Sequence, residues 1–221
     1  MPTPGLIFVR VRITSPDLSD EAFNTWYNQV HIPDALNAGL GELALRYKNL
    51  EADGKYQYCT LYKTSDIENA SNPATSAKIP ETSELLPGSG NWKELTEMSI
   101  LRFELTQRFE GQGNFTGRGD ALLTVGVEPA DEEDFEEWYR KQHLDMLSLG
   151  TGYIRATRYK LAAGHDASVP RFLALHEYET TDFPDTTLVR GTKWSKKVLS
   201  SAKVFERGAW KLIFQSGDEK L

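Results

Sequence analysis

The chain has 221 residues, of which 39% are hydrophobic and 26% are charged, and its formal net charge is −7. This length and composition allow one large domain or two small ones with a buried core. The acidic balance argues against a nucleic acid or an anionic membrane surface as a partner, and no apolar run reaches the ~18 residues of a membrane span.

A single cysteine, Cys59, excludes an internal disulfide and a multi-cysteine metal site, and it fits a reducing compartment. The apolar run at residues 6–9 is interrupted by Arg10 and Arg12, so it is too short for the apolar region of a secretory signal. We therefore expect a soluble, cytoplasmic protein.

The first half of the chain predicts the order strand, helix, strand, strand, helix, strand. Apolar residues alternate at residues 7–13, which indicates a strand, and capping residues at 14–21 start a helix. Pro33 and the glycines Gly39 and Gly41 are expected to end this helix. The remaining elements are strands at 45–49 and 56–63, a helix within 66–79 and a strand at about 98–106.

Residues 109–119 contain four glycines and few apolar residues, which predicts a linker. The second half then repeats the plan of the first. Its predicted elements are strands at 122–127, 153–160, 171–178 and 204–214, helices that begin at 130–133 and at 181–182, and a loop at 164–166.

An internal repeat supports this reading. Four residues of the first predicted helix recur 112 positions later with the same spacing. They are Phe23, Trp26, Tyr27 and His31, repeated as Phe135, Trp138, Tyr139 and His143. Such a repeat indicates two copies of one structural unit.

Each half therefore predicts a ferredoxin-like β-α-β-β-α-β unit, with helices on one face of an antiparallel sheet. The predicted fold is α+β, with tandem ferredoxin-like repeats whose two sheets pack into one intrachain α+β barrel. The repeats should span residues 1–108 and 120–221, joined by the linker at 109–119. The chain would be a monomer with this pseudo-dimeric barrel, or a homodimer if such units pair between chains.

The Phe-x-x-Trp-Tyr-x-x-x-His motif resembles the EthD-like family of the dimeric α+β barrel superfamily. The segments at residues 5–9 and 31–34 are similar to fungal tandem EthD-domain proteins. The resemblance implies a barrel interior that holds a small, often aromatic molecule. The superfamily includes cofactor-free polyketide cyclases, decarboxylases, quinone-forming monooxygenases, muconolactone isomerases and haem enzymes. The second copy departs from the pattern, because Leu144-Asp145-Met146 replaces Ile32-Pro33-Asp34.

His31 and His143 are the first candidates for catalysis, because an imidazole can take up or deliver a proton near neutral pH. Asp34, three residues after His31, could orient its ring. The alternative for each histidine is a packing role at the end of the helix, where a cation is stabilised by the helix dipole.

The third strand of each half presents an aromatic face and an aliphatic face. We expect the aliphatic face to meet the helices and the aromatic face to point into the barrel, as in a small-molecule site. His176 and Tyr178 could then act as acid or base, and Tyr58 and Tyr62 could donate hydrogen bonds to a substrate oxygen. The alternative is a packed aromatic core.

Arg10 and Arg12 are expected on the same inward side of the first strand. A buried arginine needs an anion, which could be an acidic side chain such as Glu104 or a substrate carboxylate. The alternative is an internal salt bridge or a strand end in solvent. The predicted substrate-binding residues are Arg10, Arg12, Tyr58, Tyr62, Tyr178, Trp26 and Asp34.

The sequence contains no glycine-rich phosphate loop, no serine elbow and no metal-binding histidine spacing, so we expect neither a cofactor nor a metal. The predicted function is a cofactor-independent lyase or isomerase that decarboxylates, dehydrates or cyclises a small aromatic or polyketide-like substrate. A histidine would move a proton, and tyrosines would stabilise the developing negative charge. Two alternatives remain open: a cofactor-free or haem-dependent monooxygenase or peroxidase-like enzyme, and a non-catalytic ligand-binding or stress-related protein.

Overall fold

The computed structural model describes residues 1–113, 115, 117–162 and 169–219. The predicted loop at 164–166 and positions 114 and 116 of the predicted linker lie outside the described residues. The chain divides into two compact units. Unit 1 comprises Met1–Glu104 and Leu212–Leu221, and unit 2 comprises Leu105–Lys211.

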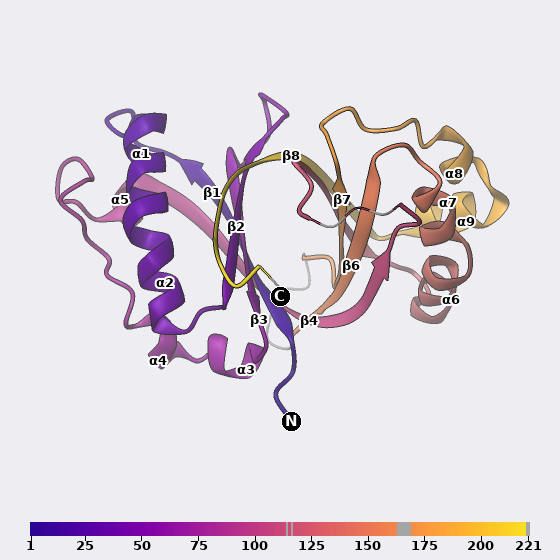
Figure 1. The fold of residues 1–221 in the computed structure, drawn as a ribbon, viewed down its shortest axis with the longest axis horizontal. Helices are drawn as coiled ribbons and strands as arrows, with labels where there is room; N and C mark the ends of the chain where they lie inside the picture. The colour runs from indigo at the N-terminus through magenta and orange to yellow at the C-terminus, as the bar shows by residue number, and fades with distance from the viewer. Residues whose placement is uncertain (114, 116, 163–168, 220–221) are drawn as a thin grey trace. The chain divides into compact units, whose positions relative to one another are not determined.

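In unit 1, one long helical segment and several short ones lie against an antiparallel sheet (Figure 1). Strand β1 pairs with both β3 and β4, and β2 pairs with β3. The strands are β1 (Gly5–Ile13), β2 (Leu43–Asn49), β3 (Tyr58–Thr64) and β4 (Thr96–Glu110). The helical segments are α1 (Asp20–Trp26), η1 (Tyr27–His31), α2 (Ile32–Ala38), α3 (Ile67–Ala70), α4 (Pro73–Ser76) and α5 (Trp92–Leu95).

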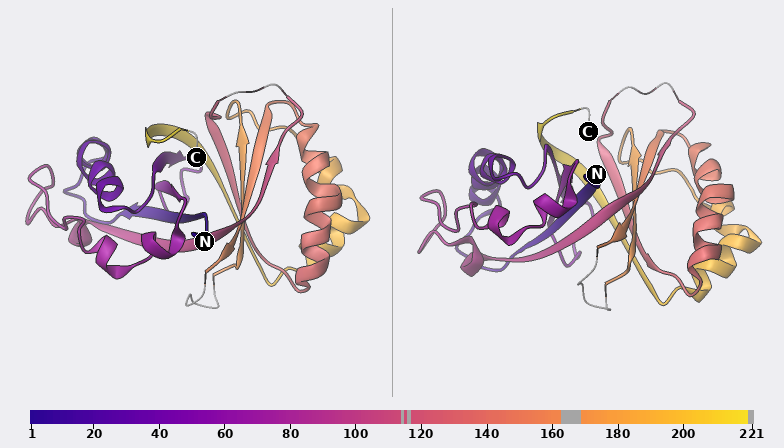
Figure 2. Two further views of the ribbon diagram at one scale, coloured as in Figure 1. Left: turned by 60° about the horizontal axis from the view of Figure 1, so that its bottom comes forward. Right: turned by 90° about the horizontal axis from the view of Figure 1, so that it is seen from below.

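Unit 2 repeats this plan, with its helices on one face of the sheet (Figure 2). Strand β5 pairs with β7 and β8, and β6 pairs with β7. The strands are β5 (Ala121–Glu128), β6 (Tyr153–Leu161), β7 (Phe172–Tyr178) and β8 (Val204–Gly217). The helical segments are α6 (Glu132–Trp138), η2 (Tyr139–His143), α7 (Leu144–Ser148), α8 (Thr187–Gly191) and α9 (Lys193–Ser201).

The order of hydrogen-bonded strands is β1-β3-β2-β8-β5-β7-β6-β4, and this order closes on itself. The predicted α+β fold with a closed antiparallel barrel built from two repeats is therefore confirmed. Among the described residues, no helix combines the length and the apolar character that crossing a membrane would require.

The first helix begins where the sequence predicts but does not end there. The side chain of Ser19 accepts a hydrogen bond from the backbone of Ala22 and caps α1. Pro33 does not stop the helix, because it lies in the first turn of α2, just after the segment η1, where the backbone hydrogen-bond register changes and a missing N–H is tolerated. The helix ends instead at Gly39, whose φ of 93° is left-handed.

The second helix of each unit differs from the prediction. In unit 1 the single helix predicted within 66–79 is two short turns, because Asn72 caps a new turn with Pro73 at its first position. In unit 2 the helix predicted to begin at 181–182 begins later, as α8 and α9, with Thr192 capping α9. Polar and proline residues between the predicted and the actual start explain the delay.

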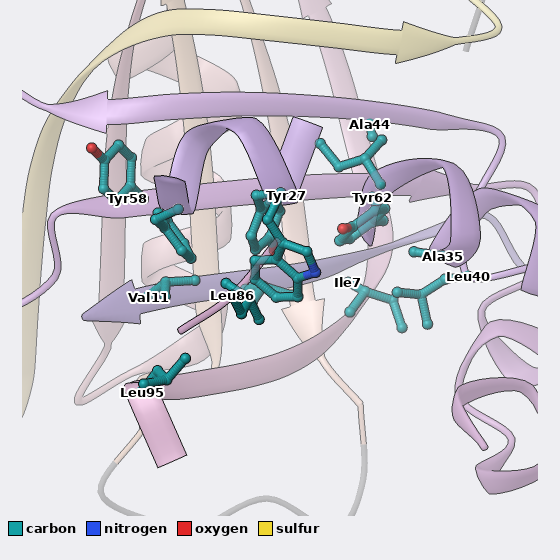
Figure 3. Packing of buried hydrophobic residues seen from close by; sticks show 14 of the residues in the cluster. Ile7, Val11, Tyr27, Ala35, Leu40, Ala44, Tyr58, Tyr62, Leu86 and Leu95 are labelled. Carbon is teal, nitrogen blue, oxygen red and sulfur yellow. The ribbon is translucent and has the colours of Figure 1, made fainter. Parts of the chain in front are cut away.

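The predicted orientation of the third strands is wrong. Tyr58 and Tyr62 belong to the cluster that packs against the helix (Figure 3). The ring centroids of Tyr58 and Phe23 are 5.2 Å apart. Every residue of β3 is buried, so its pattern does not reveal which face meets the helix. The helix itself presents aromatic rings, and aromatic rings pack favourably on other rings.

Candidate functional site

The shared motif adopts the same unusual backbone in both units. Between α1 and α2, and again between α6 and α7, the helix widens into a π-helical turn at the last five residues of the motif. The N–H of Ile32 donates to the carbonyl of Tyr27, and the N–H of Leu144 donates to that of Tyr139, each five residues back. Such π-turns occur frequently at functional sites.

The π-turn brings the motif histidine onto the tryptophan five residues before it. In a regular α-helix, residues five apart point about 140° away from each other. Here the ring centroids of Trp26 and His31 are 4.9 Å apart, and those of Trp138 and His143 are stacked at 4.0 Å. In both units, the motif histidine therefore packs on the indole ring of the motif tryptophan.

In unit 2, this histidine opens onto a cavity of about 420 Å³. Its volume lies within the ordinary range of small-molecule sites. The walls are mainly apolar, and no acidic side chain lines them in the part of the chain that the structure describes. The lining residues central to the site are Trp138, Tyr139, His143, His176, Tyr178 and Arg207.

Two imidazoles face this cavity from different elements. His143 comes from η2 and His176 from β7, and their ring centroids are 6.5 Å apart in an edge-to-face arrangement. The Nδ1 atoms of both rings are buried without a hydrogen-bond partner among the described residues. A buried polar atom without a partner is rare and is often found where a ligand or reaction uses it.

Burial keeps both imidazoles neutral. Desolvation lowers the pKa of His176 to about 4, with a smaller contribution from the charge of Arg158. Desolvation likewise holds the pKa of His143 well below its usual value, with His176 and Arg158 acting in the same direction. At neutral pH both rings can accept a proton. Tyr178 beside them has a pKa raised to about 12 by burial, so its hydroxyl remains a donor.

A buried hydrogen-bond network holds the indole under His143. The Nε1–H of Trp138 donates to Ser195 Oγ at 3.2 Å, and the Ser195 hydroxyl donates to the carbonyl of Val189 at 2.7 Å. Ser195 is completely buried. Helix α9 therefore fixes the ring on which the catalytic candidate is stacked.

Unit 1 has a smaller cavity in the equivalent place, of about 290 Å³. His31 and Tyr62 line it, together with Trp92 from α5. Desolvation lowers the pKa of His31 to about 4, and the charge of Arg46 adds to the effect. No second histidine faces His31 among the described lining residues. The strand pairing places Tyr62 of unit 1 where unit 2 has His176, because Ala44 of β2 pairs with Tyr62 and the matching Ala156 of β6 pairs with His176.

A buried arginine lies beneath the first helix of unit 1. Arg46 is fully buried, and its Nη1 donates to Asn24 Oδ1 at 2.6 Å and to Asn28 Oδ1 at 3.1 Å. Its guanidinium lies 4.6 Å from the ring centroids of Tyr27 and Tyr58. Two neutral amides and aromatic faces therefore surround this cation.

The equivalent arginine of unit 2 has a carboxylate partner. Arg158 donates to both oxygens of Glu136, at 2.5 and 3.3 Å, and to Gln107 Oε1 at 2.8 Å. Its guanidinium lies 3.9 Å from the ring centroid of Tyr139. Glu136 occupies the helix position that Asn24 has in unit 1, so the two units differ in the net charge of this buried cluster.

Several predicted site residues lie away from both cavities. Arg10 is on the sheet face opposite the helices, donates to Ser99 Oγ at 3.2 Å and lies over the ring of Tyr56. Arg12 is partly exposed and pairs with Glu97, which is not the predicted Glu104. This arrangement matches the salt-bridge alternative for Arg12.

The other predicted binding residues are structural neighbours of the cavities. The ring of Trp26 packs against the ring of His31, and the hydroxyl of Tyr58 accepts a hydrogen bond from Asn24. Asp34 is half-buried on α2 and does not line the cavity of unit 1. The structure thus brings together His143, His176 and Tyr178 in unit 2, and His31 and Tyr62 in unit 1.

Sequence reasoning missed the tryptophans and the basic residues of the cavities. Trp138 was recoverable from the repeat, since it is the copy of Trp26. Arg190, Arg207 and Arg102 also line the cavities, but they lie on elements whose orientation the sequence left open. In the described portion of the chain, no group of three or more histidine, cysteine or acidic side chains is arranged to hold a metal ion.

The chain resembles a fungal protein along most of its length. It is 26% identical over 192 residues to core atranone cluster (CAC) protein 1 of Stachybotrys chlorohalonatus, and the match covers 80% of this chain and 82% of that protein. No family model matches the chain.

Solved structures with the same fold cover nearly the whole chain. An anthrone oxidase-like protein is 10% identical, with a TM-score of 0.60 and coverage of 98% and 95% of the two chains. A monooxygenase-like protein from Fusobacterium nucleatum is 12% identical, with a TM-score of 0.58 and coverage of 99% and 96%. A variant chlorite dismutase from Candidatus Nitrospira defluvii is 9% identical, with a TM-score of 0.59 and coverage of 96% and 92%. The fold is that of the dimeric α+β barrels.

Proposed function

We propose that the protein is a cofactor-independent enzyme whose working site is the cavity of unit 2. The observation that carries this proposal is the pair of neutral imidazoles, His143 and His176, whose buried Nδ1 atoms have no partner beside an apolar cavity. The substrate class is a small aromatic or polyketide-like ketone. The name of the fungal relative, a protein of an atranone cluster, supports a role in making a small metabolite.

The first chemical step is removal of a proton from a carbon next to a carbonyl group. His176 or His143 accepts this proton, and the Tyr178 hydroxyl donates a hydrogen bond to the enolate or phenolate oxygen that forms. Because the pKa of His176 is about 4, the substrate must carry an acidified C–H, as a hydroxylated aromatic ketone does. The negative charge that develops raises the pKa of the adjacent imidazole and so favours the transfer.

An enolate in this cavity can follow more than one course. Loss of a hydroxyl group as water, or attack on a second carbonyl group, gives the dehydratase or cyclase reaction of the main proposal. In the decarboxylase reaction the same enolate would form by loss of CO₂ from a β-keto carboxylate in place of proton removal. Reaction of the same enolate with O₂ gives the monooxygenase alternative, which the likeness to an anthrone oxidase-like protein supports. We further propose that the chain is a cytoplasmic member of the EthD-like family, on the motif that both units carry.

A haem-dependent enzyme is the second candidate. An axial ligand to haem iron needs an imidazole nitrogen without another partner, and both histidines of unit 2 have one. The two histidines of unit 2 are therefore suitable in type as ligands to haem iron. A bound haem would supply one-electron and O₂ chemistry. A visible spectrum of the purified protein after incubation with haem distinguishes this candidate, because ligation by His143 or His176 gives a Soret band that is lost in the corresponding variant.

Proton abstraction can be tested without knowing the product. We expect the protein to accelerate exchange of the C10 hydrogens of anthrone for deuterium in D₂O, measured by proton NMR. Replacing His176 by threonine, which cannot accept a proton at neutral pH, should lower the catalysed rate by about 100-fold, the usual contribution of a general base. His143→Gln should lower it comparably, and Ser200→Ala, on the exposed side of α9, should not. Equal rates in all variants would reject the proposal in favour of a ligand-binding protein.

A further inference from the structure

The cavity of unit 1 has a different chemistry from that of unit 2. Its apolar wall is formed by strand residues, and its opposite side by helical segments α4 and α5. The single histidine, His31, is kept neutral by burial. The strand residues of this wall are Ile7, Val9, Met98 and Ile100. Leu40, from the segment between α2 and β2, adds to it, and Tyr62 and Trp92 are the aromatic lining residues.

Two hydrogen-bond donors of this cavity have no acceptor among the described residues. The indole Nε1–H of Trp92 is buried without a partner, although the hydrophobic ring around it is only half-buried. The Nε–H of Arg102 on β4 is likewise buried without a partner. A buried donor that lacks an acceptor destabilises the protein, so a ligand oxygen that reached either group would be bound favourably.

The charges around the cavity leave a net positive site. Lys93 and Glu81 both line it, but they form an ion pair with each other, with the Lys93 ammonium 5.5 Å from the Trp92 ring centroid. No ion pair joins Arg102 to an acidic side chain in the described residues. A guanidinium with open donors binds a planar anion in preference to a neutral molecule.

We propose that the cavity of unit 1 is a second ligand site, which binds a planar aromatic acid or phenolate. The aromatic ring would pack between the apolar strand residues and Trp92. The anionic oxygen would accept hydrogen bonds from Trp92 Nε1–H and from the Arg102 guanidinium. This site lies within unit 1 and is independent of the imidazole pair of unit 2, so it does not rest on the proposed function.

The experiment uses the full chain labelled with ¹⁵N at its five tryptophans, titrated with 1-naphthoate and, separately, with its uncharged counterpart 1-naphthamide. The indole signal of Trp92 is identified as the one that Trp92→Phe removes. We expect 1-naphthoate to shift this signal saturably and 1-naphthamide to bind at least about tenfold more weakly, as the loss of a charge-assisted hydrogen bond implies.

Three variants of arginine separate specific recognition from a general charge effect. Arg102→Gln should weaken 1-naphthoate binding about tenfold and abolish the preference over 1-naphthamide. Arg102→Lys keeps the positive charge and should weaken 1-naphthoate binding less than Arg102→Gln does. Arg108→Gln changes an exposed arginine farther along the same strand and should leave binding unchanged.

Three results would overturn the proposal. The first is a Trp92 signal that stays fixed while the Trp138 signal of unit 2 shifts. The second is equal binding of 1-naphthoate by Arg102→Gln and the unaltered protein, and the third is equal weakening by Arg102→Lys and Arg102→Gln. The other four indole signals report whether each variant is folded. None of these readouts depends on the anthrone exchange reaction.

Discussion

Unit 1 and unit 2 share an aromatic scaffold but differ in the polar groups placed around it. Both have the π-turn, the histidine on the indole and an arginine over the motif tyrosine. The arginine has amide partners in unit 1 and a carboxylate partner in unit 2. Tyr62 in unit 1 stands where unit 2 has His176.

These differences change the electrostatics of each interior. In unit 2 the charge of Arg158 is compensated by Glu136, and two neutral imidazoles share the larger cavity. In unit 1 the charge of Arg46 lies among two amides and aromatic rings, and one imidazole lines the smaller cavity among the described residues. The two units therefore share their aromatic packing and differ in the polar and charged groups around it.

Removing the carboxylate of unit 2 should have the largest effect on stability. Glu136→Ala leaves Arg158 buried without a counter-charge, which should lower the free energy of unfolding by about 3–5 kcal/mol. The matched change in unit 1, Asn24→Ala, removes one neutral acceptor while Asn28 remains, and should cost about 1 kcal/mol. Urea unfolding of both variants measures the contrast. Equal losses would mean that the two arginine clusters are energetically alike.

Replacing the second imidazole of unit 2 should flatten the dependence of stability on pH. The pKa of His176 is about 4 when folded and 6.5 in its unperturbed state, so below pH 6.5 the unfolded chain takes up the proton first. Stability is therefore lost as the pH falls. Between pH 7 and pH 5 this histidine should lower the free energy of unfolding by about 2 kcal/mol. His176→Thr should abolish that part of the pH-dependent loss. Urea unfolding at both pH values measures it, and parallel losses in the two proteins would contradict the expectation.

The network under Trp138 should show the smallest effect. Ser195→Ala leaves the indole Nε1–H without its acceptor and should cost about 1–2 kcal/mol, with a change in tryptophan emission as the ring loosens. Ser200→Ala, the same substitution at an exposed position of α9, should change stability by less than about 0.5 kcal/mol. If Ser195→Ala changed the free energy of unfolding as little as Ser200→Ala, the indole would be held by packing alone.

The sequence was sufficient for the fold because its main signals are local and repeated. The alternation in β1, the Ser19 cap and the recurrence of the motif at one fixed spacing each specify a backbone conformation directly. Two ferredoxin-like units in tandem then leave few ways of ordering the strands. The closed barrel followed from these signals.

The candidate site could be predicted less completely from the sequence than the fold, because the site depends on which face of a strand meets a helix. Strand β3 is buried on both faces, so the alternation of Tyr58 and Tyr62 with Cys59 and Leu61 does not distinguish the two orientations. The partner of Arg12 is set by the pairing register of β1 and β4, which a sequence pattern does not give. The pairing of His143 with His176 required that same three-dimensional information.

The π-turn also bears on the history of the chain. A π-turn is an α-helix with one residue added, and its neighbours on either side keep their helical positions. Both units have the added residue at the same place, between the motif tyrosine and the motif histidine. A single insertion in one ancestral unit, before the duplication that produced this chain, accounts for both. If that insertion came first, the feature that packs each histidine on its indole is older than the tandem architecture itself.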